Sequence, residues 1–140
     1  MAGTTLDKGA AEAIAGGWHG DPFAVLGPHK VAKGWEVRAF VPGAERLWLI
    51  SGKTEVEAEG YPDVPGLFTA AMARKGKYKF RAQGHGTTWE FDDPYRFGPV
   101  LGEMDEYLLG EGTHRRLWQV LGAHVMTHEG ADGVHFAVWA

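Results

Sequence analysis

Apolar residues recur at every second position through the middle of this chain. Residues 35–41 alternate in this way, with Trp35 and Val37 on the apolar side. The same period of two predicts further strands, most of them bounded by glycine or proline turns, at 46–51, 54–59, 67–72, 77–83, 87–92 and 133–140. Three glutamates fill one side of 54–59, so that strand should have a solvated face. Alternating strands need a second layer over their apolar side, so we predict a mainly β fold, an Ig-like antiparallel β-sandwich.

Two short segments carry a helical period instead. Residues 5–15 place their apolar side chains on one face and are followed by Gly16-Gly17, which predicts a helix near the N-terminus. Residues 113–121 predict a second helix, capped by Thr113, whose buried face would include Trp118. Between the last two predicted strands, residues 100–112 are expected to form a loop or a one-turn helix.

Composition narrows the class of protein. The 140 residues correspond to about one domain. A net charge of −4, with no run of more than two basic residues, argues against a nucleic-acid partner. The absence of cysteine excludes disulfides and thiolate metal sites. No long apolar run suggests a signal peptide or a membrane span, so we expect a soluble, cytoplasmic protein with no membrane partner.

Three histidines in the C-terminal third could suggest a metal site. His114, His124 and His128 are ten and four residues apart, and Gly122 interrupts the predicted helix between the first two. No carboxylate completes a known ligand spacing. We therefore interpret them as surface or capping histidines, and predict no metal and no cofactor.

Acidic residues are frequent, but their pattern does not predict a catalytic pair. Glycosidic chemistry needs two carboxyl groups facing each other across a sugar ring. The acids here are either neighbours in a turn or spread along a loop: Asp92, Asp93, Glu103, Asp105, Glu106 and Glu111. Asp93 precedes a proline, which is typical of a turn former. We assign no catalytic residue.

Two tryptophans are candidate sugar platforms, because an aromatic face offers an apolar surface to the C–H side of a pyranose. Trp48 lies on the opposite side of its strand from Leu47 and Leu49. Trp89 lies in a short strand with polar neighbours. Core packing remains the alternative for both, so Trp48 and Trp89 stand as candidate binding residues only.

Four collinear stretches resemble bacterial 1,4-alpha-glucan (glycogen) branching enzymes, three of them the N-terminal module and the last the start of the module that follows. The most specific is "DPYRFGPVLGEMDEYLLGEGTHRRLWQVLGAH" at 93–124. The others are "HGDPFAVLGPHK" at 19–30, "VRAFVPGAERLWLI" at 37–50 and "GVHFAVWA" at 133–140. Together they span nearly the whole chain in the order that the family has.

The resemblance implies a multidomain transglycosidase of the α-amylase superfamily. Such an enzyme would cut an α-1,4 linkage and transfer the glucan segment to a 6-hydroxyl. That chemistry belongs to a (β/α)-barrel of ~250 residues, which this chain is too short to contain. We therefore expect the chain alone to be inactive. The implied partners are α-glucan, as glycogen or maltooligosaccharide, and the remaining domains of the enzyme.

The last stretch, 133–140, repeats the pattern of 34–41, with Gly133 matching Gly34. The resemblance assigns it to the first strand of a second, glycogen-binding-type sandwich. The predicted organisation is a helix and lead-in at 1–18, an N-terminal β-sandwich at 19–128 and the start of a truncated second module at 129–140. The function expected is non-catalytic help with glucan binding and chain-length choice. A purely structural packing module and a stand-alone glucan-binding domain remain open as alternatives.

Overall fold

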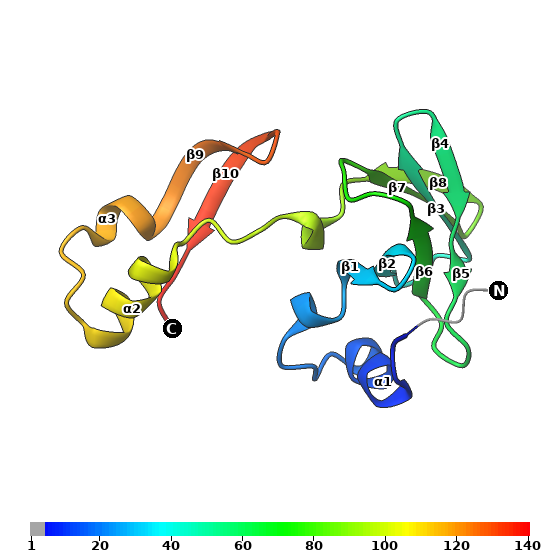
Figure 1. The fold of residues 1–140 in the computed structure, drawn as a ribbon, viewed down its shortest axis with the longest axis horizontal. Coiled ribbons are helices and arrows are strands. Elements are labelled where there is room, and N and C mark those ends of the chain that lie inside the picture. The colour runs from blue at the N-terminus through cyan, green and yellow to red at the C-terminus, as the bar shows by residue number, and fades with distance from the viewer. Residues whose placement is uncertain (1–4) are drawn as a thin grey trace. The chain divides into compact units, whose positions relative to one another are not determined.

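The computed structural model describes residues 5–140 (Figure 1). The chain divides into two compact units, Met1–Arg96 and Phe97–Ala140. No helix within residues 5–140 is long and apolar enough to cross a membrane.

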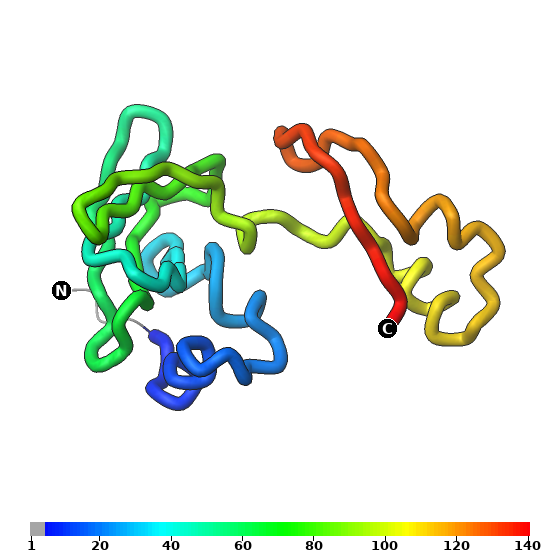
Figure 2. The backbone as a smooth tube through the Cα atoms, turned by 180° about the vertical axis from the view of Figure 1, so that it is seen from behind, coloured from blue at the N-terminus to red at the C-terminus, as the bar shows by residue number. Residues whose placement is uncertain are grey.

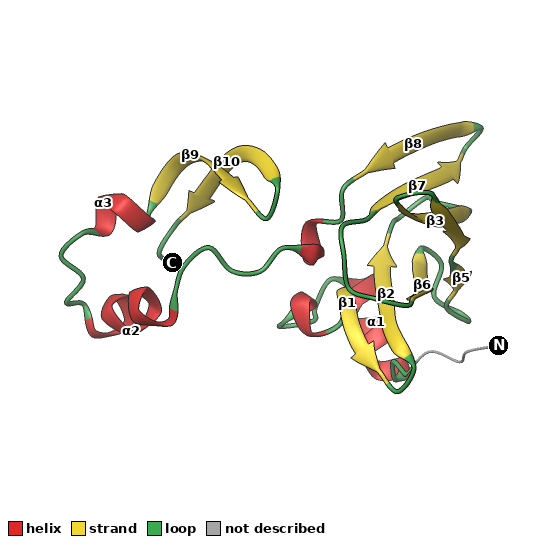
Figure 3. Ribbon diagram, turned by 45° about the horizontal axis from the view of Figure 1, so that its top comes forward, coloured by secondary structure: helices red, strands yellow, loops and turns green. Residues whose placement is uncertain are grey.

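The first unit contains two four-stranded antiparallel sheets, whose strands are drawn in yellow in Figure 3. One sheet has the order β1 (Gly27–Val31), β2 (Gly34–Phe40), β6 (Leu67–Met72) and β5 (Glu59–Gly60). The other has the order β4 (Thr54–Glu57), β3 (Arg46–Ser51), β7 (Lys79–Gly84) and β8 (Thr87–Phe91). The mainly β sandwich predicted from the alternating pattern is confirmed.

The core of the sandwich follows the period of two. Val37 and Ala39 of β2 are buried, as are Leu47 and Leu49 of β3. Phe80 of β7 is 1% exposed and lies between two rings, with centroid distances of 5.5 Å to Tyr78 and 5.6 Å to Phe91. Alternate residues of each inner strand therefore meet across the two layers, as a sandwich requires.

Helix α1 (Lys8–Gly16) confirms the predicted N-terminal helix. The Asp7 carboxylate accepts a hydrogen bond from the Ala10 N–H, and Gly17 ends the helix in the left-handed conformation. Its buried residues Ala11 and Ile14 belong to a second apolar cluster that includes Leu67 of β6. Leu67 pairs with Phe40 and alternates with the sandwich-facing Phe68, so α1 covers the outer face of the β1–β2–β6–β5 sheet.

The predicted strand 54–59 is wrong in one respect that shapes the surface. The segment breaks at the buried Ala58 into β4 and β5, which belong to different sheets. Val56 pairs with Leu49 in one layer, whereas Glu59 pairs with Thr69 in the other. Alternation alone cannot reveal this crossing, because the apolar period continues through it.

The second unit consists of two short helices, α2 (Glu103–Glu111) and α3 (Leu117–Val120), and a hairpin of β9 (Gly122–His128) and β10 (Ala131–Ala137). Figure 2 shows the two strands of the hairpin running side by side. Residues 100–112 therefore hold a nine-residue helix rather than a loop or a single turn. The Asp105 carboxylate accepts a hydrogen bond from the Gly102 N–H at the N-terminus of this helix. Asp105 is one of three acidic residues in the first turn, where negative charge stabilises a helix.

The prediction for residues 113–121 is only partly right. The helix there is the four-residue α3, and Trp118, which was expected in a buried face, is 68% exposed. No residue of 97–140 is buried, because one hairpin and two short helices are too few elements to enclose a side chain as large as that of Trp118. The domain boundaries at 18/19 and 128/129 remain predictions, and residues 1–4 of the first segment lie outside the described residues.

Candidate functional site

Trp48 lies near the middle of the outward face of the β4–β3–β7–β8 sheet. It is half-buried, and its cross-strand neighbours are Glu57 on β4 and Arg81 on β7. The Arg46 guanidinium carbon lies 4.6 Å from the centre of the Trp48 ring, a cation–π contact. Residues on this face alternate with the buried Leu47 and Leu49, which confirms that Trp48 points away from the core.

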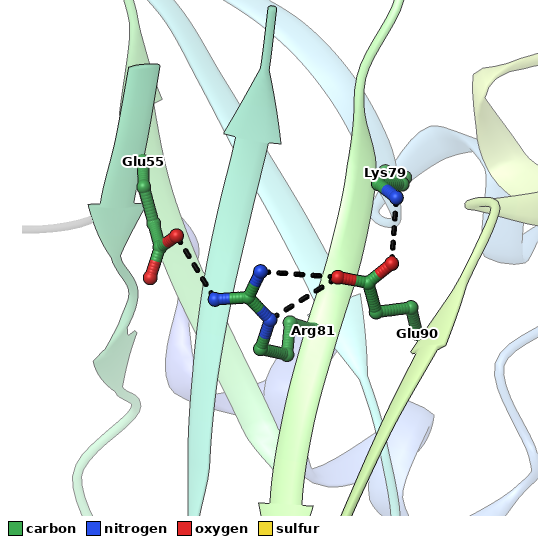
Figure 4. A network of polar contacts seen from close by, with 4 residues as sticks. All are labelled: Glu55, Lys79, Arg81 and Glu90. Carbon is green, nitrogen blue, oxygen red and sulfur yellow. Dashed lines mark hydrogen bonds and ion pairs between the residues drawn. The ribbon is translucent and has the colours of Figure 1, made fainter. Parts of the chain in front are cut away.

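Charged side chains surround Trp48 in matched pairs. Figure 4 shows Arg81 between Glu55 and Glu90, with Lys79 on the other side of Glu90. Arg81 donates to Glu90 at 3.1 and 3.2 Å and to Glu55 at 2.9 Å, and Lys79 donates to Glu90 at 2.6 Å. Arg46 binds Glu57 through two further hydrogen bonds of 2.8 and 3.0 Å. Three cations thus balance three carboxylates, so the face around Trp48 is polar but close to neutral.

These pairs shift the titration of the carboxyl groups. The hydrogen bond from Lys79, helped by Arg81, lowers the pKa of Glu90. The hydrogen bond from Arg46 lowers the pKa of Glu57. Both carboxyl groups are solvent-accessible, so the pairs order the surface more than they stabilise the fold.

Trp89 lies on the other face of the same sheet. It pairs with Ala82, which is fully buried and pairs in turn with Leu47 on the core side. Because β8 is an edge strand, 36% of Trp89 remains exposed. The structure therefore does not bring Trp48 and Trp89 together, and the two cannot form one platform.

Trp89 lines an aromatic hollow of about 270 Å³ at the end of the sandwich. Its walls include the aromatic residues Phe40, Phe91 and Tyr95, together with Asp93. Asp93 is 2% exposed. Its Oδ2 accepts a hydrogen bond of 2.5 Å from the Tyr78 hydroxyl, and its Oδ1 accepts one of 2.9 Å from the Tyr95 N–H. Burial raises the pKa of Asp93 although both hydrogen bonds favour the ionised form. The residue closes a turn, as its position before Pro94 predicted.

The histidines hold backbone and side-chain contacts of their own. His114 Nε2 lies 2.9 Å from Asp105 and lowers the pKa of that carboxyl. His124 Nε2 lies 2.8 Å from the Leu121 carbonyl oxygen, and His128 Nε2 lies 2.8 Å from that of Gly98. Within residues 5–140, no group of three or more His, Cys, Asp or Glu side chains is arranged to hold a metal ion.

A second hollow was missed by the sequence reasoning. It has a volume of about 370 Å³ and is lined by Trp35, by the end of β4 and by the free edge of β6. The alternation at 35–41 assigned Trp35 to the core side, but it could not show that the crossing at Ala58 leaves this side of the strand open.

Comparison with known proteins identifies the family. Residues 7–95 match the family model described as alpha-1,4-glucan branching enzyme GlgB, N-terminal domain. The chain belongs to this family. The match coincides closely with the first compact unit and contains the stretches at 19–30 and 37–50, and it confirms the family resemblance inferred from the sequence.

Relatives of this GlgB N-terminal domain are much longer than the chain. It is 53% identical over 135 residues to the 1,4-alpha-glucan branching enzyme GlgB of Roseobacter denitrificans, covering 93% of this chain and 18% of that protein. The same enzyme of Mesorhizobium japonicum is 51% identical over 132 residues, covering 91% and 18%. A solved pullulanase mutant from Paenibacillus barengoltzii, complexed with maltotetraose, aligns with a TM-score of 0.45 and 17% identity over 87% of this chain and 20% of that one.

Proposed function

We propose that this chain is a non-catalytic module of a 1,4-alpha-glucan branching enzyme, which helps to hold α-glucan and influences the length of the chain transferred. The intact enzyme would move an α-1,4-linked segment to a 6-hydroxyl in glycogen synthesis in the cytoplasm. The described residues form a sandwich covered by helix α1, two further short helices and a hairpin, and a barrel of ~250 residues has no room in this chain. Catalysis therefore falls to other parts of the enzyme.

Trp48 is the observation that supports glucan binding most directly. An aromatic ring in a polar, nearly neutral sheet face can stack on the C–H side of a glucose unit while its charged neighbours hydrogen-bond to hydroxyl groups. A neutral polymer is not repelled by such a face. Trp89 is proposed as a second, separate contact, in a hollow with far fewer polar groups.

The second unit supports a packing role alongside glucan binding. On one face of the hairpin, Val125 is 88% and Phe136 72% exposed. Val125 pairs with Val134, and Phe136 with Ala123, so these side chains share that face. We propose that residues 129–140 begin a second sandwich module, whose further strands would cover this face, and that the remaining domains of the enzyme are the partners.

Affinity electrophoresis of the 140-residue chain in gels containing glycogen tests the proposal. Retardation should be saturable and should weaken in Trp48→Ala, and to a smaller extent in Trp89→Ala. Trp118→Ala is the matched control, because it removes an exposed tryptophan of the other unit and should leave mobility unchanged. If the unsubstituted chain is not retarded, the glucan-binding part of the proposal is wrong and the purely structural role is left.

A further inference from the structure

Three polar side chains form a row across the outward face of the β4–β3–β7–β8 sheet, next to Trp48. Arg46 on β3 pairs with Gln83 on β7, and Gln83 pairs with Thr88 on β8. Residues directly opposite one another on antiparallel strands lie on the same face of the sheet. All three are exposed, and Gln83 alternates with the fully buried Ala82, so this polar row lies on the solvent side together with Trp48. It crosses three strands, which are spaced about 4.8 Å apart.

The polar row differs from the rest of this face in its hydrogen bonding. The four residues of Figure 4 bind one another through ion pairs. By contrast, within residues 5–140 the carboxamide of Gln83 and the hydroxyl of Thr88 make no hydrogen bond. A carboxamide both donates and accepts hydrogen bonds, and so does a hydroxyl group. These two side chains can therefore bind hydroxyl groups of a ligand without breaking a contact inside the protein.

Arg46 is held in place by two of its neighbours. Its Nε and Nη2 atoms donate to the two carboxylate oxygens of Glu57 at 2.8 and 3.0 Å. Its guanidinium carbon lies 4.6 Å from the centre of the Trp48 ring. In the part of the chain that the structure describes, Nη1 donates to no acceptor, so its two N–H groups remain for a ligand. A planar guanidinium that is already fixed in this way loses little conformational freedom when it binds a ligand.

The charges and the neighbouring aromatic ring favour a neutral ligand that is rich in hydroxyl groups. Glu57 balances the charge of Arg46, and the other two members of the polar row are uncharged, so an anion gains little net attraction here. Arg46 lies over the Trp48 ring, so a sugar unit that contacts the remaining exposed part of this half-buried side chain also lies beside the guanidinium. Apolar contact and hydroxyl hydrogen bonds are thus offered by one continuous surface.

We propose that Arg46, Gln83 and Thr88 bind the hydroxyl groups of an α-glucan chain that lies across β3, β7 and β8 at Trp48. Arg46 donates through Nη1, while Gln83 and Thr88 both donate and accept. This inference rests on the proposed glucan-binding role. It adds the side chains that recognise the hydroxyl groups and the direction in which the polymer crosses the sheet.

Titration of the 140-residue chain with maltoheptaose, followed by NMR, tests the polar row. The side-chain amide signals of Gln83, the Nε–H signal of Arg46 and the backbone amide of Thr88 should shift together with the indole N–H of Trp48. The side-chain amide signals of Gln119, an exposed glutamine of the other unit, should stay in place.

Substitutions measure the contribution of each group. Gln83→Ala and Thr88→Val should each weaken maltoheptaose binding by about three- to tenfold, as expected for the loss of a hydrogen bond. Arg46→Lys keeps the positive charge but lacks the planar fork, and should weaken binding to a similar extent. The matched controls are Gln119→Ala and Thr54→Val, which remove an exposed carboxamide and an exposed hydroxyl group outside the polar row. Both should stay within about twofold of the unsubstituted chain.

The outcomes separate the polar row from the broader function. Normal affinity of Gln83→Ala, Thr88→Val and Arg46→Lys, with weakened binding by Trp48→Ala, would overturn the polar row and leave the glucan-binding role intact. Absence of any shift with maltoheptaose, together with no retardation by glycogen, would overturn both. If a variant does not fold, the unsubstituted chain decides: unperturbed side-chain signals of Arg46 and Gln83 would refute the polar row, whether or not glycogen retards the chain.

Discussion

Replacing Tyr78 by phenylalanine should weaken the sandwich by an amount that depends on pH. The Tyr78 hydroxyl donates to the Asp93 carboxyl at 2.5 Å, and the two side chains are 3% and 2% exposed. A hydrogen bond to a charged group contributes about 1.5–3 kcal/mol, and the loss is greatest where no water replaces the donor. For a unit of this size each kcal/mol lowers the melting temperature by about 4–8 °C.

The pH dependence follows from the effect of the bond on Asp93. Burial raises the pKa of Asp93, while the Tyr78 hydroxyl and the Tyr95 N–H oppose that rise. Without the Tyr78 donor, the folded variant should bind the Asp93 proton at a higher pH than the unsubstituted protein does. The loss of stability is therefore largest near neutral pH, where the carboxylate is ionised in both proteins, and shrinks as the pH falls through the folded-state pKa of Asp93.

Thermal unfolding of Tyr78→Phe and of the unsubstituted protein between pH 7 and pH 4 measures the loss of stability at each pH. Amide hydrogen exchange in β3 and β7 shows where the loss is located. Tyr107→Phe is the matched control, because the Tyr107 hydroxyl also donates to a carboxylate, Glu111 at 2.7 Å, but the residue is 59% exposed. That variant should unfold like the unsubstituted protein. A penalty for Tyr78→Phe that is the same at every pH, or no larger than that of Tyr107→Phe, would refute the reasoning.

Three further predictions concern the backbone, the charged face and the hairpin. Gly84→Ala should destabilise the sandwich by about 1–3 kcal/mol in urea unfolding, because its Cβ would lie 2.1 Å from the Gly43 carbonyl oxygen, whereas Gly60→Ala, with nothing within 4 Å, should not. Glu90→Gln should lower the urea midpoint at pH 7, and the difference should shrink on acidification. A carboxyl group whose pKa is lowered in the folded state stabilises the protein above its unfolded pKa, and that contribution is lost as the pH falls through the folded-state pKa. A difference that does not shrink between pH 7 and pH 3 would contradict this. Phe136→Thr should reduce self-association in light scattering, since it removes a 72% exposed aromatic from the hairpin face, and an unchanged apparent mass would count against that.

The inner faces of the sandwich could be predicted from sequence because alternation is a local property. Val37 and Ala39 are buried as the period of two at 35–41 requires. The break at Ala58 could not be predicted, since the same alternation continues while the strand changes sheets. The exposure of Trp118 was also missed, because the apolar spacing of 117–121 predicts a buried face only where a core exists to receive it.

The candidate site was predictable in type but not in geometry. Leu47 and Leu49 on either side of Trp48 correctly indicated that its ring points outward. Trp89 has polar neighbours in sequence, Thr88 and Glu90, yet its pairing with Ala82 places it on the core side of the sheet. Strand register is a long-range property, so the separation of the two tryptophans and the opening beside Trp35 emerge only from the fold.

The central claim, that this module holds α-glucan without transforming it, is tested most directly by incubating the 140-residue chain with amylose. The fraction of amylose bound and the branch content after debranching are measured in the same sample. We predict saturable binding with no new α-1,6 linkages and an unchanged chain-length distribution. Absence of binding, or the formation of α-1,6 branches by the chain alone, would contradict the claim.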